Sequence, residues 1–338
     1  MKNTPFIFRL SVIFLIFSIL CAPLSRIPRA SLSVEKISAF FKDLILTISN
    51  RAERSLFEVL IVAVIALSLS FFVSVLFIDK YKAKRFFLSS LSVLLIAVSL
   101  FLVIVFPKRN VSYFDSYEAN REELILLLEF FSAEINSFSD PPRQAPSDYE
   151  AIIYDSYREL DYPLSLTKTY PKIKATLAPR LATRLRVLAK YSFLTSEIAL
   201  NESAPEYTHP FSAAHEMAHL FGVFSEGEAN LFAYITLTNT KSEYLRYSAY
   251  LSAFEYVFSS LSSLDSEREW NIYSSLPDFA KNDIKAYYDF YYSFSSGVSD
   301  ISDAMNSALS GALSDGENRS YESFAGLLVP IVLHRTSN

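Results

Sequence analysis

The sequence predicts a mainly α-helical protein, with N-terminal transmembrane helices followed by a mostly helical domain that contains a minimal β element. Three observations support this fold class. The chain of 338 residues is 51% hydrophobic and only 20% charged, and its mean hydropathy is +0.23. Long uncharged runs gather near the N-terminus, and apolar residues recur with helical spacing beyond them. The same composition excludes an intrinsically disordered chain, which needs few apolar residues and high charge.

Three apolar segments predict a membrane anchor over residues 1–106. Residues 59–78 and 86–106 contain no charged residue, and each matches the roughly 20 residues that cross about 30 Å of hydrocarbon. Residues 5–24 form a third candidate span, for which a cleaved secretory signal is the alternative. The basic connector 79–85 predicts a cytoplasmic loop, so everything after residue 106 is expected outside the cytoplasm, and the lipid bilayer is an expected partner.

The composition changes after the membrane anchor, and residues 107–338 are expected to form a separate helical domain. About 230 residues are enough for a hydrophobic core of their own. One strand is expected over residues 191–200. Helical spacing predicts further elements over residues 117–136, 149–160 and 179–191, and a series of helices over residues 210–333.

Charge and residue counts narrow the possible chemistry. The net charge is −5 and the isoelectric point is near 5.5, which argues against nucleic acid as a partner. Cys21 is the only cysteine, so an intramolecular disulfide and a cysteine-based metal site are excluded. Any histidine-based metal site must use the four histidines of the chain, which are His209, His215, His219 and His334.

The most informative motif is His215-Glu216-Met217-Ala218-His219, an HExxH pattern. On a helix, residues i and i+4 lie on one face about 6 Å apart, so both imidazoles can bind one metal ion while Glu216 acts on a water as general base. The alternative is a helix with two ordinary histidines and a solvated glutamate. It would leave two imidazoles in an apolar stretch in need of polar partners. We therefore predict that His215 and His219 bind one Zn²⁺ ion.

A catalytic zinc ion usually has three protein ligands, and the nearest carboxylates after the motif are Glu226 and Glu228. Ser225 and Glu228 match a capping box, which would start a second helix and occupy Glu228. Glu226 is therefore the favoured third ligand, Glu228 is the alternative, and a capping or solvated role is open for either. Asn230, one turn after Glu226, is expected to orient a ligand imidazole.

Tyrosines further along the chain are candidates for stabilising a developing oxyanion. Tyr247 is the preferred candidate and Tyr250 the second, although the presence of 21 tyrosines in the chain favours a core role for both. The strand over residues 191–200 is a candidate for pairing with an extended substrate.

Several sequence blocks resemble a bacterial membrane family, domain-of-unknown-function family 3810, of the zincin-like metallopeptidase clan. The resemblance implies an anchor in the bacterial plasma membrane and a helical, zincin-like metallopeptidase domain. Its E-x-x-A-N block is similar to the ExxAD motif of other zincins, which implies Glu226 as a metal ligand. The chain departs from the family pattern at Tyr113-Phe114-Asp115, where an Asn-Tyr-Tyr-Arg-like segment is expected. The matching blocks are residues 33–37, 215–219, 226–234, 246–250 and 320–322.

The leading hypothesis is a membrane-anchored zinc-dependent metallopeptidase that hydrolyses peptide bonds of a peptide or protein substrate, with Glu216 as general base. The alternative is a non-catalytic, metal-binding structural or sensory membrane protein. An intramembrane protease is disfavoured, because the apolar run 211–224 around the motif is too short to span a bilayer.

Overall fold

The computed structural model describes residues 5–24, 28–77, 80–105, 112–139, 145–261, 267–292 and 320–334. The chain divides into two compact units. Unit 1 consists of residues 1–109 together with 167–171 and 192–197, and unit 2 consists of residues 110–166, 172–191 and 198–338. The predicted boundary at residues 106/107 lies within a few residues of the first passage between the units. No pattern in the sequence indicated that two short later segments belong to unit 1.

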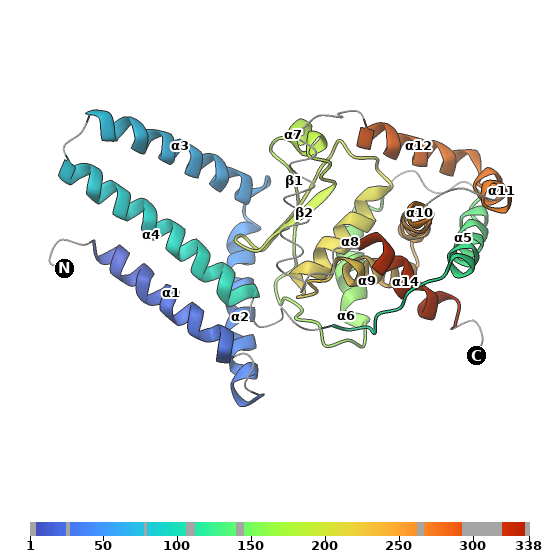
Figure 1. Ribbon diagram of the computed structural model, residues 1–338, viewed down its shortest axis with the longest axis horizontal. Helices are drawn as coiled ribbons and strands as arrows, with labels where there is room; N and C mark the ends of the chain where they lie inside the picture. Colours follow the sequence, from blue (N-terminus) through green and yellow to red (C-terminus); the bar gives the residue numbers. More distant parts are fainter. Residues whose placement is uncertain are drawn as a thin grey trace. The chain divides into compact units, whose positions relative to one another are not determined.

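In its described residues, unit 1 contains four helices, which are α1 (Phe6–Leu24), α2 (Pro28–Ser49), α3 (Leu56–Phe77) and α4 (Lys80–Val105) (Figure 1). Each of the other three helices packs against α4, and α1 does so along much of its length. Serines inside these apolar helices satisfy their hydroxyl groups within the helix. Ser18, Ser92 and Ser99 each donate to the backbone carbonyl four residues earlier, so they can be buried without an unpaired hydroxyl.

Across the residues that the structure describes, none of the helices combines the length and the apolar character that crossing a bilayer requires. The predicted transmembrane helices at residues 5–24, 59–78 and 86–106 are therefore wrong. The predicted location as a multi-pass protein of the bacterial plasma membrane is wrong as well, and the placement of residues 107–338 outside the cytoplasm, which was derived from those spans, loses its basis. A long uncharged run does not distinguish a spanning helix from one that packs against other helices. Here most of the run 86–106 lies in α4, which begins at Lys80 inside the basic connector and contacts α1, α2 and α3. The run 59–78 begins in α3, on which the large apolar side chains from Val59 to Leu69 are exposed.

Glu197 holds the 192–197 segment within unit 1. Its side chain is almost completely buried, and its two carboxylate oxygens accept four hydrogen bonds near the start of α3. The first N–H groups of a helix have no partner inside the helix, and a negative charge is favourable there. The donors are Ser49 Oγ (2.9 Å), Ser55 Oγ (2.8 Å), the Leu56 amide (3.1 Å) and the Phe57 amide (2.7 Å).

A three-stranded sheet stands where one strand was expected. Its strands are β1 (Ile173–Ala175), β2 (Ala189–Ser192) and β3 (Glu197–Leu200), in the order β1-β3-β2. β1 and β3 are parallel, with Ile173 opposite Ile198. The predicted strand over 191–200 is thus interrupted by a turn, in which Ser196 adopts a positive φ of 50°. The predicted helix over 179–191 is also shorter, because α7 (Pro179–Arg184) ends before Arg186, whose φ is 56°.

The predicted mostly helical character of the chain is confirmed. α5 (Arg121–Asn136) begins later than the predicted residue 117, because Asn120 and Glu123 form a reciprocal capping box at its start. The other helices within the described part of unit 2 are α6 (Tyr149–Glu159), α8 (Thr208–Leu220), α9 (Glu226–Thr238), α10 (Glu243–Ser260), α11 (Glu267–Ser275), α12 (Asp278–Tyr292) and α14 (Ser320–Val332).

Helices α8 and α9 lie in the middle of unit 2 (Figure 1), and α9 packs against α6, α8, α10 and α14. Small side chains allow two helices to approach closely. A hydrogen bond also joins α6 to α8, because the hydroxyl of Tyr157 on α6 donates to the backbone carbonyl of Ala214 at 2.7 Å. Alanines without any exposed surface occur on both central helices, namely Ala213, Ala214 and Ala218 on α8 and Ala229 and Ala233 on α9.

Helix α14 closes the core over α9 and α10. Phe324 and Leu328 are completely buried. Gly326 lies against the backbone of Tyr117, and a Cβ atom at this position would stand only 1.9 Å from the Tyr117 carbonyl oxygen. The helix therefore requires glycine here for close backbone approach.

Replacing Gly326 with alanine should lower the free energy of unfolding by about 1–3 kcal/mol, because the backbone must shift to accommodate the methyl group. Urea unfolding followed by far-UV circular dichroism measures the change. Glu159→Ala, at an exposed position on α6, is the matched control and should change little. Equal midpoints for Gly326→Ala and the wild type would contradict this packing.

One tyrosine–carboxyl pair connects the start of α8 to α10, and a second pair connects α10 to α12. The Tyr207 hydroxyl donates to Glu255 at 2.7 Å, and the Tyr247 hydroxyl donates to Asp283 at 2.6 Å. Burial raises the pKa of Glu255 to about 8; the hydrogen bond from Tyr207 opposes this rise and the nearby charge of Asp283 adds to it. The folded protein therefore keeps a proton on Glu255 at neutral pH.

This proton makes stability depend on pH. The pKa of Glu255 is raised above its ordinary value of 4.5 in the folded state, so its contribution is fully present below about pH 4.5 and is lost as the pH rises to about 8. Glu255→Gln removes the titration. The free energy of unfolding of the wild type should therefore fall relative to that of Glu255→Gln across this range in urea titrations. Parallel pH profiles for the two proteins would refute the assignment.

Candidate metal-binding site

The site is built on the turn between α8 and α9. α8 ends at Leu220, and Gly222 follows with a φ of 95°, a left-handed conformation that glycine adopts without strain. The Ser225 hydroxyl then accepts the N–H of Glu228, which caps α9 at the predicted residue. The turn thus brings the first residue of α9, Glu226, back toward the last turns of α8.

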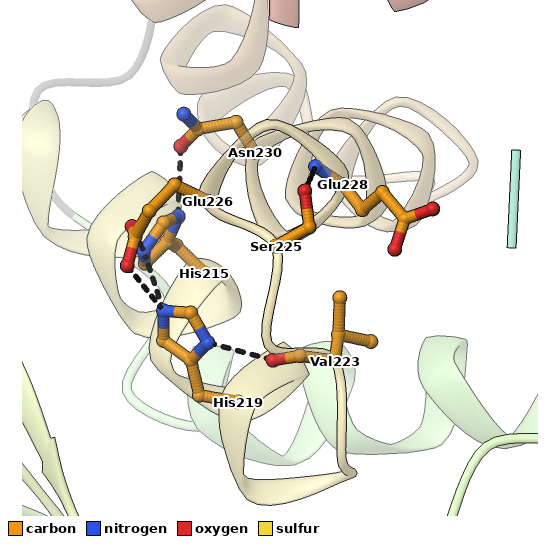
Figure 2. A network of polar contacts seen from close by, with 7 residues as sticks. All are labelled: His215, His219, Val223, Ser225, Glu226, Glu228 and Asn230. Carbon is orange, nitrogen blue, oxygen red and sulfur yellow. Dashed lines mark hydrogen bonds and ion pairs between the residues drawn. The ribbon is translucent and has the colours of Figure 1, made fainter. Parts of the chain in front are cut away.

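Three side chains converge at this turn: His215, His219 and Glu226 (Figure 2). One ligand atom from each lies within 4.8 Å of the other two. The Nε2 atoms of the two histidines are 3.0 Å apart. The carboxylate oxygens of Glu226 lie 3.2 Å from Nε2 of His215 and 3.6 Å from Nε2 of His219.

The second nitrogen of each imidazole is fixed by a hydrogen bond (Figure 2). Nδ1 of His215 lies 2.7 Å from Oδ1 of Asn230, and Nδ1 of His219 lies 2.7 Å from the backbone carbonyl of Val223. Because a carbonyl oxygen only accepts, Nδ1 carries the proton in both rings. Each Nε2 therefore directs a lone pair toward the other ligand atoms, the arrangement in which outer hydrogen bonds orient metal-binding histidines.

These donors fit a zinc ion. Two imidazole nitrogens and a carboxylate oxygen are typical zinc ligands, and ligands about 2.0–2.1 Å from a tetrahedral ion lie about 3.3–3.4 Å from one another. The observed separations of 3.0, 3.2 and 3.6 Å are close to that spacing. Two lone pairs that face each other across 3.0 Å also repel unless a cation lies between them.

Without a metal ion, a proton on His219 takes the place of the cation between the two imidazoles. Burial lowers the pKa of His219, but the charge and hydrogen bond of Glu226 outweigh it and raise the pKa to about 9. Burial raises the pKa of Glu226, whereas the two histidines lower it further, to well below 4.5. The site therefore combines a carboxylate with a protonated imidazole, and a metal ion that binds here must displace the proton.

Glu216 of the HExxH motif lies beside these groups and is itself buried. Burial raises its pKa, while the neighbouring imidazoles His215 and His219 and the backbone amide of Tyr191 lower it. The Tyr191 amide belongs to β2, so this strand contacts Glu216 of the motif. A carboxylate whose pKa is raised by burial is suited to accept a proton near neutral pH.

A sequence profile described as "Protein of unknown function (DUF3810)" matches residues 34–329. The chain belongs to the DUF3810 family. The predicted resemblance to this family is thereby confirmed. No curated protein sequence and no solved structure matches the chain.

Two of the sequence blocks that resembled the DUF3810 family lie at this site in the structure. The first is the HExxH motif on α8, and the second, residues 226–234, forms the first turns of α9. Glu228, the alternative to Glu226 as third ligand, does not join the cluster. Its carboxylate instead accepts hydrogen bonds from Ser112, Tyr113 and Phe114, and the reciprocal bond of a capping box to the Ser225 amide, which the sequence predicted, is not formed.

Tyr247, the predicted oxyanion donor, has other partners in this DUF3810 protein. Its hydroxyl donates to Asp283, and its ring packs against Phe138 and Phe279. It is almost completely buried, and these partners do not belong to the three converging side chains. The structure therefore gives no support to the proposed catalytic role of Tyr247.

Sequence reasoning missed several groups that shape the site. Ser248 on α10 accepts the Phe211 amide and donates to the carbonyl of Tyr207, which ties down the start of α8. The backbone amide of Tyr191 donates to Glu216, and those of Tyr113 and Phe114 donate to Glu228. A pattern of residue types in the sequence does not reveal such backbone contacts. His209 and His334, which were not predicted as ligands, contact the carbonyl of Ala204 and the ring of Tyr117, respectively.

The hydrogen bond between Asn230 and His215 provides a test of the site. Asn230→Ala frees the imidazole to rotate, so zinc should bind about 10–100-fold more weakly. Competition with a chromophoric zinc chelator measures the affinity. Asn239→Ala, at an exposed position just after α9, should bind zinc like the wild type. Identical affinities for both variants would show that Asn230 does not orient a ligand.

Proposed function

We propose that the protein is a zinc-dependent metallopeptidase that hydrolyses peptide bonds. One observation carries this proposal: three converging metal-ligating side chains lie beside a buried glutamate, Glu216, in an HExxH helix. This pattern pairs a metal ion with a general base. Membership of the DUF3810 family assigns no activity, so the proposal depends on the chemistry of the site.

The number of ligands favours a catalytic site over a structural one. Structural zinc sites usually have four protein ligands, whereas catalytic sites have three and an open position. Among the residues that the structure describes, only His215, His219 and Glu226 form such a cluster. Their side chains are 14%, 12% and 37% exposed, so the cluster is not completely sealed from solvent.

The roles of the chain's own residues follow from this geometry. His215, His219 and Glu226 would hold the ion, while Asn230 and the Val223 carbonyl keep the imidazoles oriented. Zinc, when bound, supplies Lewis acidity, which lowers the pKa of a bound water to about 7 and polarises the scissile carbonyl. Glu216 accepts the proton of the attacking water and delivers it to the leaving amine.

The alternative function is a metal-binding structural or sensory protein that cleaves nothing. In that case the three ligands would still bind zinc, but the identity of residue 216 would not matter for any reaction. The two functions therefore differ in their dependence on Glu216.

Glu216→Gln separates these functions. The amide keeps the size of the side chain but cannot accept the proton, so cleavage of a mixed peptide library should fall at least about 100-fold while zinc content by elemental analysis stays at one ion per chain. Glu159→Gln, at an exposed position, is the matched control and should cleave like the wild type. Full zinc content with no cleavage by the wild type would favour the structural or sensory role, and no zinc in the wild type would refute both.

A further inference from the structure

Glu228 binds a separate segment of unit 2 through one of its carboxylate oxygens. Oε1 accepts hydrogen bonds from the Ser112 hydroxyl (2.8 Å), the Tyr113 amide (2.7 Å) and the Phe114 amide (3.1 Å). The side chain is only 3% exposed. Hydrogen bonds to a charged acceptor are stronger than neutral ones, especially in a buried setting. Glu228 therefore fastens residues 112–114 firmly to the first turn of α9.

Glu228 and Glu226 point to different sides of that turn. Residues two positions apart on a helix are rotated by about 200°, and Figure 2 shows the Glu228 side chain directed away from Glu226 and from both histidines. The same turn of α9 is therefore held on one side by residues 112–114 and presents a metal-ligating carboxylate on the other.

A second contact lies one turn further along α9. The rings of Tyr113 and Phe114 both pack against Phe232, with centroid distances of 5.3 and 5.4 Å. Glu228 and Phe232 are four residues apart and thus share a helix face. Residues 112–114 consequently contact α9 at two levels, which restricts both its rotation and its sliding.

We propose that Glu228 is a positioning residue that sets the orientation of Glu226 by clamping α9 to residues 112–114. This inference rests on the proposed function, since it concerns the same metal site. Two of the three donors are backbone amides, which are present whatever the side chains at positions 113 and 114.

Two substitutions of Glu228 test the clamp in the full-length protein. Glu228→Ala removes the acceptor, so hydrogen–deuterium exchange of amides 226–230 in the metal-free protein should be at least tenfold faster. Zinc, measured by chelator competition, should bind at least tenfold more weakly. Glu228→Gln retains a carbonyl oxygen for the same donors and should restore most of both properties.

Ile272→Ala serves as a matched control, because Ile272 is buried on α11, which packs against α5, and its loss destabilises unit 2 away from the first turn of α9. At equal residual stability it should leave zinc affinity and the exchange of amides 226–230 near the wild-type values. The inference is overturned if Ile272→Ala weakens zinc binding as much as Glu228→Ala, if Glu228→Gln restores nothing, or if Glu228→Ala behaves like the wild type. Absence of zinc binding in the wild type would refute the proposed function instead, and the exchange measurement would still decide whether Glu228 clamps α9.

Discussion

The candidate site depends on one constraint. Three side-chain atoms with lone pairs, which are Nε2 of His215, Nε2 of His219 and a carboxylate oxygen of Glu226, must be held close together although the neutral rings place no N–H between them. His215, His219 and Glu226 satisfy it because α8 and α9 approach closely through buried alanines and because Gly222 reverses the chain sharply between them. Such a cluster is unfavourable by itself. In the metal-free protein, the imidazole of His219 is protonated because its pKa is raised, and this proton offsets the repulsion.

Much of the surrounding structure serves to hold this arrangement. Asn230 and the Val223 carbonyl fix the rings, Ser225 fixes the start of α9, and Tyr157 fixes the middle of α8. None of these residues contributes a ligand atom to the cluster. Orienting bonds of this kind determine how tightly a site binds its metal ion, so the affinity of the site is expected to depend on residues of α6, of α9 and of the turn between α8 and α9.

The sequence was most informative where chemistry and local structure coincide. The HExxH spacing identified His215, Glu216 and His219, and the capping preference of serine located the start of α9. The capping argument gave Glu228 the wrong partner, because a helix-start pattern shows nothing of residues 112–114, more than a hundred positions earlier in the chain. Glu197 escaped notice for the same reason, since its four partners lie near α3. The apolar runs failed as evidence for transmembrane helices because hydrophobicity alone does not reveal what a helix packs against.

We expect one zinc ion to lie between His215, His219 and Glu226. Anomalous diffraction from crystals of the zinc-loaded protein, recorded on both sides of the zinc absorption edge, would locate the ion. A single strong anomalous peak should lie about 2.0–2.1 Å from Nε2 of each histidine and from a carboxylate oxygen of Glu226. A zinc peak elsewhere in the molecule, or no peak in fully loaded crystals, would contradict this expectation.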